Sequence, residues 1–180
     1  MKKFVILAIS FLLTACSTPD QKSDSAGTPI ATTSATVAVT NLGSKIEPNL
    51  VLSDLATGSK LKFANITKPV VITFWASWCT TCRQEFELWR DEALANNVVG
   101  INVQDARGSN YLRTAAYNLM KQNDTVFPSY ADTDEVLTSA LGIVGLPVTI
   151  VVASDGRITA RHDGLMTKKK MLSYIAMTKN

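Results

Sequence analysis

The chain is poor in the residues that usually build metal centres, and it has no apolar run long enough to cross a membrane. Only three of its 180 residues are cysteine, and His162 is the only histidine. A zinc site needs about four ligands, and beyond a cysteine pair only His162, far along the chain, is left to contribute. The longest mostly apolar run, Phe4–Leu13, has ten residues, whereas a membrane-spanning helix needs about 20. These shortages argue against a zinc protein and against a transmembrane helix.

The N-terminal 44 residues do not have the pattern of a folded domain. A short positive region, an apolar run and small residues before Cys16 are typical of a secretory signal peptide. Ser17–Ser44 is rich in Ser, Thr, Ala, Asp and Pro, so it buries too little apolar surface to fold. We therefore predict a signal peptide over residues 1–15, a lipid-bearing Cys16 with a flexible tether over 16–44, and one domain over 45–180.

The charge balance excludes some partners. Without Lys2 and Lys3 of the signal peptide, 16 basic residues remain against 15 acidic ones. A near-neutral chain gives no reason to expect nucleic acid or a strongly acidic partner. The run Lys168–Lys170 is interpreted as the solvated start of a helix, with contact to anionic lipid as the alternative.

Strand and helix patterns alternate along residues 45–180. The β-branched and aromatic run Val70–Trp75 predicts the central strand, and a helix follows with Cys82, Phe86, Trp89 and Ala93 on one apolar stripe. This order, closed by a hairpin and a last helix, indicates an α/β fold with a mixed sheet flanked by helices. The other expected elements are an edge strand or extended lead-in at Ile46–Leu52, strands at Leu61–Phe63, Val98–Val103, Val148–Val152 and Arg157–Arg161, an extended piece at Val126–Pro128, a loop at Asp105–Asn110, and helices at Tyr111–Gln122 (with Leu112, Ala115, Ala116 and Leu119 inward), Asp134–Leu141 and Thr167–Met177.

The most informative motif is the C-x-x-C pair at Cys79 and Cys82, between the predicted central strand and the helix. A thiol at a helix N-terminus meets unpaired N–H groups and the positive end of the helix dipole, both of which favour the thiolate. The second thiol lies about one helical turn further on, within reach of a disulfide. The arrangement predicts thiol–disulfide exchange, with Cys79 as the attacking nucleophile and Cys82 as the resolving thiol.

Two other interpretations of the pair remain. One is a structural disulfide, although a bridge that closes so short a loop stabilises a protein only weakly. The other is half of a zinc site, for which only His162 is left to help, and His162 is more simply an ordinary strand residue. An exported protein with a single such pair more often uses it for redox chemistry.

Four segments resemble the thioredoxin fold, and within it the TlpA/ResA-like group of membrane-tethered bacterial thiol–disulfide oxidoreductases. They are Glu47–Leu52, Thr73–Phe86, Gly145–Thr149, and Ser154–Ile158 with Gly164. The resemblance implies a thioredoxin fold with a helical insertion between Val103 and Val148.

The resemblance also implies roles for residues around the pair. Pro147 corresponds to the cis-proline that faces the active-site cysteines, and the backbone of Leu146 is then free to pair with an extended substrate. Glu85 corresponds to a glutamate that handles protons or tunes the thiol pKa, a task that falls to it because Thr73 replaces the buried aspartate of plain thioredoxin. Trp78 is expected to shield one side of Cys79 while leaving it reachable.

The chain departs from the family pattern at two places. Thr80-Thr81 stands between the cysteines where a proline-containing pair is common, and this dipeptide affects thiolate stabilisation. Leu146 is bulkier than the residue often found before the cis-proline, which bears on substrate choice.

A second resemblance concerns Leu13-Thr14-Ala15-Cys16, which is similar to the lipobox of bacterial lipoproteins. It implies that Cys16 is lipidated and becomes the first residue of the mature protein; an ordinary cleaved signal peptide is the alternative. Acyl chains would hold the protein on the outer side of the cell membrane, or on the outer membrane of a Gram-negative cell.

We therefore predict an exported, lipid-anchored oxidoreductase that reduces disulfides of protein substrates and receives electrons from an integral-membrane donor. No cofactor, metal or nucleic acid is expected. Alternatives are a disulfide-forming oxidant, a peroxidase, or a copper- or thiol-binding lipoprotein without turnover, since soft thiolates suit Cu(I).

Overall fold

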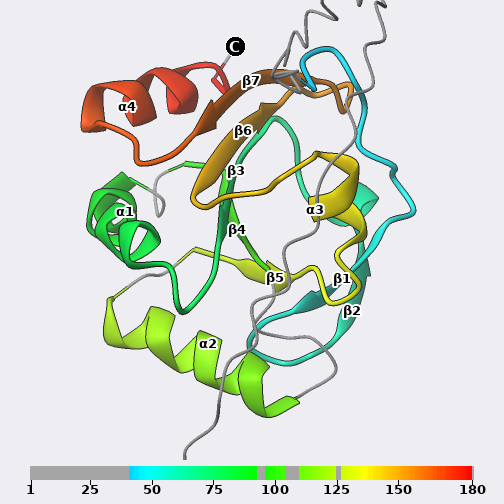
Figure 1. Ribbon diagram of the computed structural model, residues 1–180. Coiled ribbons are helices and arrows are strands. Elements are labelled where there is room, and N and C mark those ends of the chain that lie inside the picture. Colours follow the sequence, from blue (N-terminus) through cyan, green and yellow to red (C-terminus); the bar gives the residue numbers. More distant parts are fainter. Residues whose placement is uncertain (1–40, 93–95, 104–109, 125–126, 180) are drawn as a thin grey trace, which may run out of the picture. The chain divides into compact units, whose positions relative to one another are not determined.

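A computed structural model describes residues 41–92, 96–103, 110–124 and 127–179 (Figure 1). They form one seven-stranded sheet in the order β2-β1-β5-β4-β3-β6-β7, with helices on both faces. Within these ranges no helix combines the length and the apolar character that a membrane span requires. The expected thioredoxin-like fold is confirmed, while the expected signal peptide, Cys16 and most of the tether lie outside the described residues.

The strands and helices have the following bounds: β1 (Val51–Asp54), β2 (Lys60–Lys62), a 3-10 turn (Phe63–Asn65), β3 (Val70–Trp75), α1 (Thr80–Glu92), β4 (Val98–Asn102), α2 (Asn110–Gln122), β5 (Ser129–Ala131), α3 (Val136–Ala140), β6 (Val148–Val152), β7 (Ile158–Asp163) and α4 (Lys168–Ala176).

Strand β3 lies in the interior of the sheet and leads directly to the cysteine pair. It runs parallel to β4, with Trp75 opposite Asn102, and antiparallel to β6, with Phe74 opposite Val148. All six of its residues are buried. Because helices cover both faces of the sheet at this point, the strand is apolar almost throughout rather than alternating.

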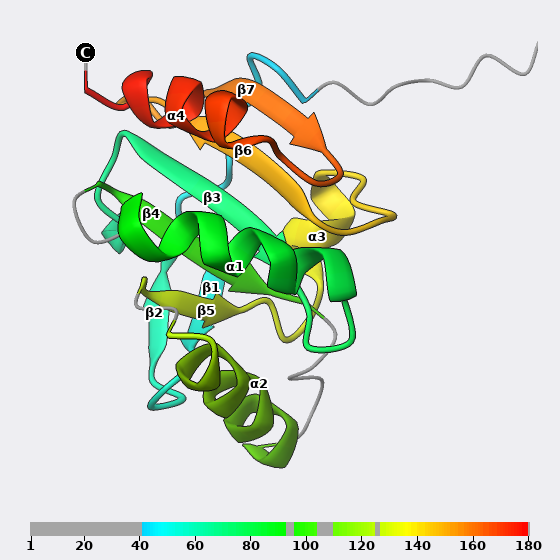
Figure 2. The same ribbon diagram turned by 90° about the vertical axis from the view of Figure 1, so that its left-hand side faces the viewer.

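Helices α1, α2 and α4 cover one face of the sheet, and α3 covers the other (Figures 1 and 2). The crossovers β3-α1-β4 and β4-α2-β5 proceed in the same direction along the sheet, and right-handed crossovers then place α1 and α2 on one face. Trp75 packs edge-on against Phe86 of α1, with ring centroids 5.1 Å apart, and Phe86 in turn packs against Phe127 at 6.4 Å. These rings anchor α1, and therefore the cysteines, to the sheet.

Gly100 of β4 makes room for this packing. The Trp75 indole donates to Ser129 Oγ at 3.1 Å, directly over Gly100. A Cβ atom at Gly100 would lie 2.2 Å from Ser129 Oγ, 2.7 Å from Phe127 Cε2 and 2.9 Å from Trp75 Nε1. Only glycine fits at this position without displacement of its neighbours.

Several expected elements are confirmed, among them β3, β6, the start of α1 and the Thr167 cap of α4, where Thr167 Oγ1 accepts from the Lys170 N–H. The chain leaves the hairpin turn through Gly156, whose φ is +84°. Trp89 shares the buried stripe of α1 with Cys82 and Phe86, as expected. Ala93 and most of the expected Asp105–Asn110 loop lie outside the described residues.

The periphery differs from expectation at three places. Of the two alternatives for Ile46–Leu52, the extended lead-in fits the residues before Val51, where β1 starts; β1 is not an edge strand, because it pairs with both β2 and β5, and β2 is the edge. Strand β5 at Ser129–Ala131 was not predicted; it begins directly after the expected extended piece, since a proline lacks the N–H that a paired interior strand needs. In α2 the buried residues between Leu112 and Gln122 are Ala116 and Met120, not the expected set.

The inward face of α2 is therefore rotated from the one expected. Leu112 and Ala115 are exposed, Leu119 is half-buried, and of the four expected inward residues only Ala116 is fully buried. The local pattern contains apolar residues on two overlapping faces of the helix. Packing against the sheet selects one of them.

Candidate active site

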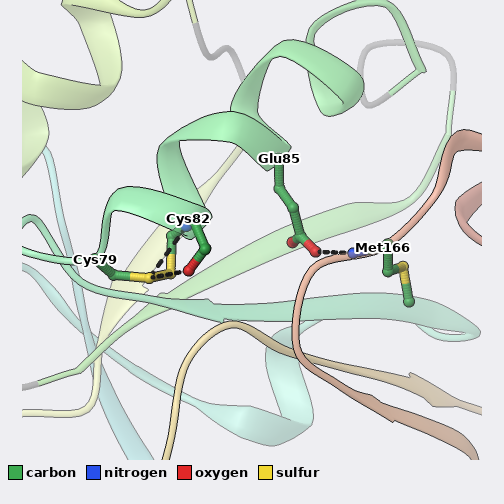
Figure 3. Close-up of a disulfide and its surroundings, with 5 residues drawn as sticks. Cys79, Cys82, Glu85 and Met166 are labelled. Carbon is green, nitrogen blue, oxygen red and sulfur yellow. Dashed lines mark hydrogen bonds between the residues drawn. A yellow bond between two sulfur atoms is a disulfide. The ribbon is translucent and has the colours of Figure 1, made fainter.

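The cysteine pair lies at the junction between β3 and α1. The chain leaves β3 at Trp75, turns at Ala76–Trp78 and enters α1 at Thr80, with the Cys79 N–H donating to Ala76 O at 3.1 Å. Cys79 and Cys82 are joined by a disulfide, with their Cα atoms 5.3 Å apart (Figure 3). The strand end thus places the first sulfur at the start of the helix.

Two groups of α1 point at the Cys79 sulfur. The Cys82 N–H donates to Cys79 Sγ at 3.1 Å, and Thr81 Oγ1 lies 3.4 Å from the same sulfur. When the disulfide is reduced and Cys79 is a thiolate, both groups can donate hydrogen bonds to the anion. Together with the positive end of the helix dipole, they favour the charged form of Cys79.

Access to the two sulfurs is unequal. Cys79 is 4% exposed and Cys82 is 1% exposed, whereas the neighbouring Trp78 is 58% exposed. Trp78 therefore projects from the surface beside a cysteine that is largely covered. A partner that reaches the disulfide meets Cys79 before Cys82.

Among the side chains that the structure describes, Glu85 is the only fully buried glutamate, and it lies one turn beyond Cys82 on α1. Its Oε1 atom accepts from the Met166 N–H at 2.7 Å, as Figure 3 shows, which ties α1 to the segment between β7 and α4. Burial raises the pKa of Glu85, and the Met166 bond offsets this only in part.

The second carboxylate oxygen of Glu85 lies in an unusual environment. The Trp89 indole and the Thr73 hydroxyl lie close enough to lower the pKa of Glu85 slightly. Neither Glu85 Oε2 nor Trp89 Nε1 makes a hydrogen bond of good geometry, however, and Thr149 Oγ1 is also buried without a partner. Because a buried carboxylate without a full set of hydrogen bonds prefers its neutral form, Glu85 keeps its proton to a higher pH than a solvent-exposed glutamate does.

The loop before β6 lies beside the disulfide turn. The Leu146–Pro147 peptide bond is cis, as expected, and a second cis bond at Lys68–Pro69 was not predicted. Since Phe74 pairs with Val148, Pro147 lies next to Trp75 at the end of β3 from which the cysteine turn departs. Leu146 is half-buried.

The structure thus brings Trp78, Cys79 and Cys82 to one end of the sheet, with the Leu146–Pro147 bond beside them and the buried Glu85 one turn further along α1. His162 lies on β7, with Nε2 3.4 Å from Leu165 O. Among the described side chains, no three His, Cys, Asp or Glu residues are grouped as metal ligands would be. The proposed lipid site, Cys16, lies outside the described part of the chain.

Some contacts of the site were not predicted from the sequence. Thr81 was noted only as an unusual residue between the cysteines, and Met166 carries no motif at all. A backbone N–H is present at almost every residue, so no sequence signal could have identified the one that binds Glu85. The position of Thr81 at a helix start could have indicated its contact with sulfur.

Comparison with known proteins agrees with this site. A family model described as Redoxin matches residues 41–175. The thiol-disulfide oxidoreductase ResA of Bacillus subtilis is 27% identical over an alignment of 138 residues that covers 73% of this chain and 73% of that protein. The thiol:disulfide interchange protein DsbE of Yersinia pestis is 37% identical over 98 residues, which are 54% of this chain and 50% of that protein.

Solved structures with the same fold include secreted and lipoprotein members. A secreted disulfide oxidoreductase of Mycobacterium tuberculosis superimposes with a TM-score of 0.59 at 21% identity, covering 72% of this chain and 96% of that one. The exposed lipoprotein thioredoxin Etrx1 of Streptococcus pneumoniae gives a TM-score of 0.57 at 22% identity, covering 71% and 97%. At these identities the likeness shows a shared fold.

Proposed function

The chain belongs to the Redoxin family and is a thiol–disulfide oxidoreductase of the ResA/DsbE kind, and from this we propose that it is exported, lipid-anchored through Cys16, and reduces disulfides in other proteins. The observation that carries the proposal is the Cys79–Cys82 disulfide at the start of α1. The signal-peptide pattern and the Leu13–Cys16 segment support export and anchoring. So does the likeness to Etrx1, which is itself described as an exposed lipoprotein.

In the proposed reaction the reduced pair donates two electrons to a substrate disulfide. The Cys79 thiolate attacks one substrate sulfur, forms a mixed disulfide and releases the other substrate sulfur as a thiolate. Cys82 then loses its proton and attacks Cys79 Sγ, which releases the second substrate thiolate and forms the Cys79–Cys82 disulfide. A dithiol donor, which we propose is an integral-membrane protein, reduces the pair again.

The supporting residues have separate tasks in this scheme. We propose that Glu85 accepts the proton of Cys82, because it lies one turn away on α1 and its pKa is raised by burial. Pro147 has no N–H that could donate to the sulfur, and Leu146 offers its backbone to an extended substrate. Trp78 supplies apolar contact area beside Cys79.

Trapping the intermediate tests the two cysteine roles. Reduced Cys82→Ser protein, mixed with insulin, should accumulate a covalent adduct that dithiothreitol removes. Cys79 can still attack the substrate disulfide, but no second thiol is left in the protein to resolve the mixed disulfide. Cys79→Ser should give no adduct and no turnover. An adduct through Cys82 in the Cys79→Ser protein, or none in either variant, would contradict the assignment.

The direction of electron flow is tested by the reduction potential of the pair. A reductase should have a potential closer to about −270 mV, as in thioredoxin, than to about −120 mV, as in the oxidant DsbA. The potential is measured by equilibrating the protein with glutathione or reduced thioredoxin. The fraction reduced is then determined by alkylating the free cysteines and weighing the products by mass spectrometry. A value near that of DsbA would make the protein a disulfide-forming oxidant instead.

Anchoring is tested by labelling the expressed full chain with radioactive palmitate. The wild type should carry label and remain in the membrane fraction, whereas Cys16→Ala should carry none and become soluble. Equal labelling of both proteins would contradict lipidation at Cys16.

A further inference from the structure

We propose that Arg161 is a positioning residue for substrate binding, which holds the end of α3 and with it the short loop that leads to Pro147. The inference rests on the proposed function, in which a substrate polypeptide contacts the backbone at Leu146. Arg161 lies on β7 opposite Ile150 of β6 and touches neither cysteine in any described contact. Its effect would therefore be indirect, through the loop.

The Arg161 guanidinium joins three segments that are distant in sequence. Its Nε and Nη2 atoms donate to the Asp163 carboxylate at 3.0 and 2.9 Å. Its Nη1 atom donates to Leu141 O and to Asn41 Oδ1, both at 2.5 Å. The arginine side chain is only 9% exposed, so its bonds to Leu141 and Asn41 are partly protected from competing water, whereas the Asp163 carboxylate is 62% exposed.

Helix α3 is fixed at both ends by charged groups. At its start, the buried Asp132 carboxylate accepts from the Leu137 and Thr138 N–H groups and from the Thr138 hydroxyl. At its end, Leu141 O receives the Arg161 guanidinium. The signs suit the helix dipole, with the anion at the N-terminus and the cation at the C-terminus. A helix of five residues has little stability of its own, so these two contacts, together with the buried side chains of Leu137 and Leu141, hold it in position.

The substrate loop is the five-residue segment 142–146, which lies between this helix end and Pro147. It begins with Gly142, whose φ is +56°, and its far end is fixed by β6 and by the Gly164 N–H, which donates to Pro147 O at 2.8 Å. Between the anchors, Val144 is fully exposed, and a Cβ at Gly145 would meet no atom within 4 Å. The middle of the substrate loop therefore has little packing of its own, and its ends determine its conformation.

Loss of the Arg161 anchor should allow the substrate loop to leave the geometry that binds an extended chain. If the loop then spends about one tenth of its time in that geometry, the apparent affinity for a polypeptide substrate falls about tenfold. The sulfur chemistry should be unaffected, because Cys79, Thr81 and Glu85 keep all of their contacts. The expected signature is a higher KM without a change in the potential of the cysteine pair.

Arg157 provides a matched control on the same strand. Its Nη1 atom donates to Gly43 O at 2.7 Å, and its Nε lies 3.1 Å from the Asp155 carboxylate. It therefore contacts the same N-terminal segment as Arg161 and pairs with an aspartate two residues away, but it has no described contact with α3. Arg157→Met removes the same charge without releasing the substrate loop.

The experiment compares wild type, Arg161→Met, Arg161→Lys and Arg157→Met with two substrates. Insulin is the polypeptide substrate, and 2-hydroxyethyl disulfide is a small one that reaches the cysteines without needing the substrate loop. We expect KM for insulin to rise about tenfold in Arg161→Met, less in Arg161→Lys and not in Arg157→Met. The rate with 2-hydroxyethyl disulfide and kcat for insulin should remain within twofold of the wild-type values. The reduction potential should equal that of wild type within experimental error.

Other outcomes overturn the proposal. An unchanged KM for insulin in a folded Arg161→Met protein would show that the arginine does not position the loop, and equal slowing with both substrates would place its effect at the cysteines. If both Arg161 variants fail to fold while Arg157→Met folds, Arg161 is a stability residue only. Absence of disulfide exchange in the wild type would instead refute the proposed function.

Discussion

The contact between Thr81 and the Cys79 sulfur gives the sharpest prediction of the chemistry. Thr81→Val keeps the shape of the side chain and removes the hydroxyl that lies 3.4 Å from Cys79 Sγ. A hydrogen bond to a charged group contributes about 1.5–3 kcal/mol at good geometry. Thr81 is exposed, so water competes for the thiolate, and we reduce this to roughly 0.7–1.4 kcal/mol.

The same free energy sets the size of two measurable changes. The pH at which half of Cys79 reacts with iodoacetamide should rise by roughly 0.5–1 in Thr81→Val, since one pKa unit corresponds to about 1.4 kcal/mol. The thiolate exists only in the reduced protein, so losing its donor makes reduction less favourable. The potential should therefore become more negative by roughly 15–30 mV at a pH where Cys79 is ionised.

Thr80→Val is the control for this prediction. Thr80 is also exposed and β-branched and lies in the same turn of α1, but it has no described contact with the sulfur. Its alkylation profile and potential should match those of wild type. The reasoning is refuted if Thr81→Val leaves both quantities unchanged, or if Thr80→Val changes them equally.

Three further predictions concern buried groups. Burial raises the pKa of Glu85, so the unfolding free energy of the oxidised protein should fall as pH rises from the ordinary value of 4.5 to the raised one. Urea unfolding of Glu85→Gln should lack this fall, and its insulin turnover should be about a hundredfold slower. If the pH profiles of unfolding and of turnover are the same in the variant as in wild type, Glu85 has no proton role. In the same urea assay, Gly100→Ala should lower the unfolding free energy by about 3 kcal/mol, whereas the control Gly145→Ala should lower it by less than about 0.5 kcal/mol. Equal losses in the two variants would contradict the close packing over Gly100. Asp132→Asn should cost about 1.5–3 kcal/mol in thermal unfolding, because α3 loses a charged acceptor, and a cost near zero would show that the cap is dispensable.

Much of the central fold could be predicted from the sequence because the signals there are local. The apolar run of β3 predicts a strand covered on both faces, and the spacing of Cys82, Phe86 and Trp89 predicts the buried stripe of α1. Thr167 predicts the start of α4 for the same reason, since a cap acts within a few residues. In α2, by contrast, two apolar faces overlap, and the sequence favoured the wrong one.

The sequence by itself therefore determined the chemistry of the protein, because two cysteines at a fixed spacing between a strand and a helix start constitute a local pattern. Only the tertiary structure decided what surrounds that pattern. Glu85 meets its partner at Met166, 81 residues away, and Arg161 meets Asn41, 120 residues away. Such contacts leave no local periodicity, since burial and hydrogen bonding between distant segments arise only when the sheet and its helices pack together.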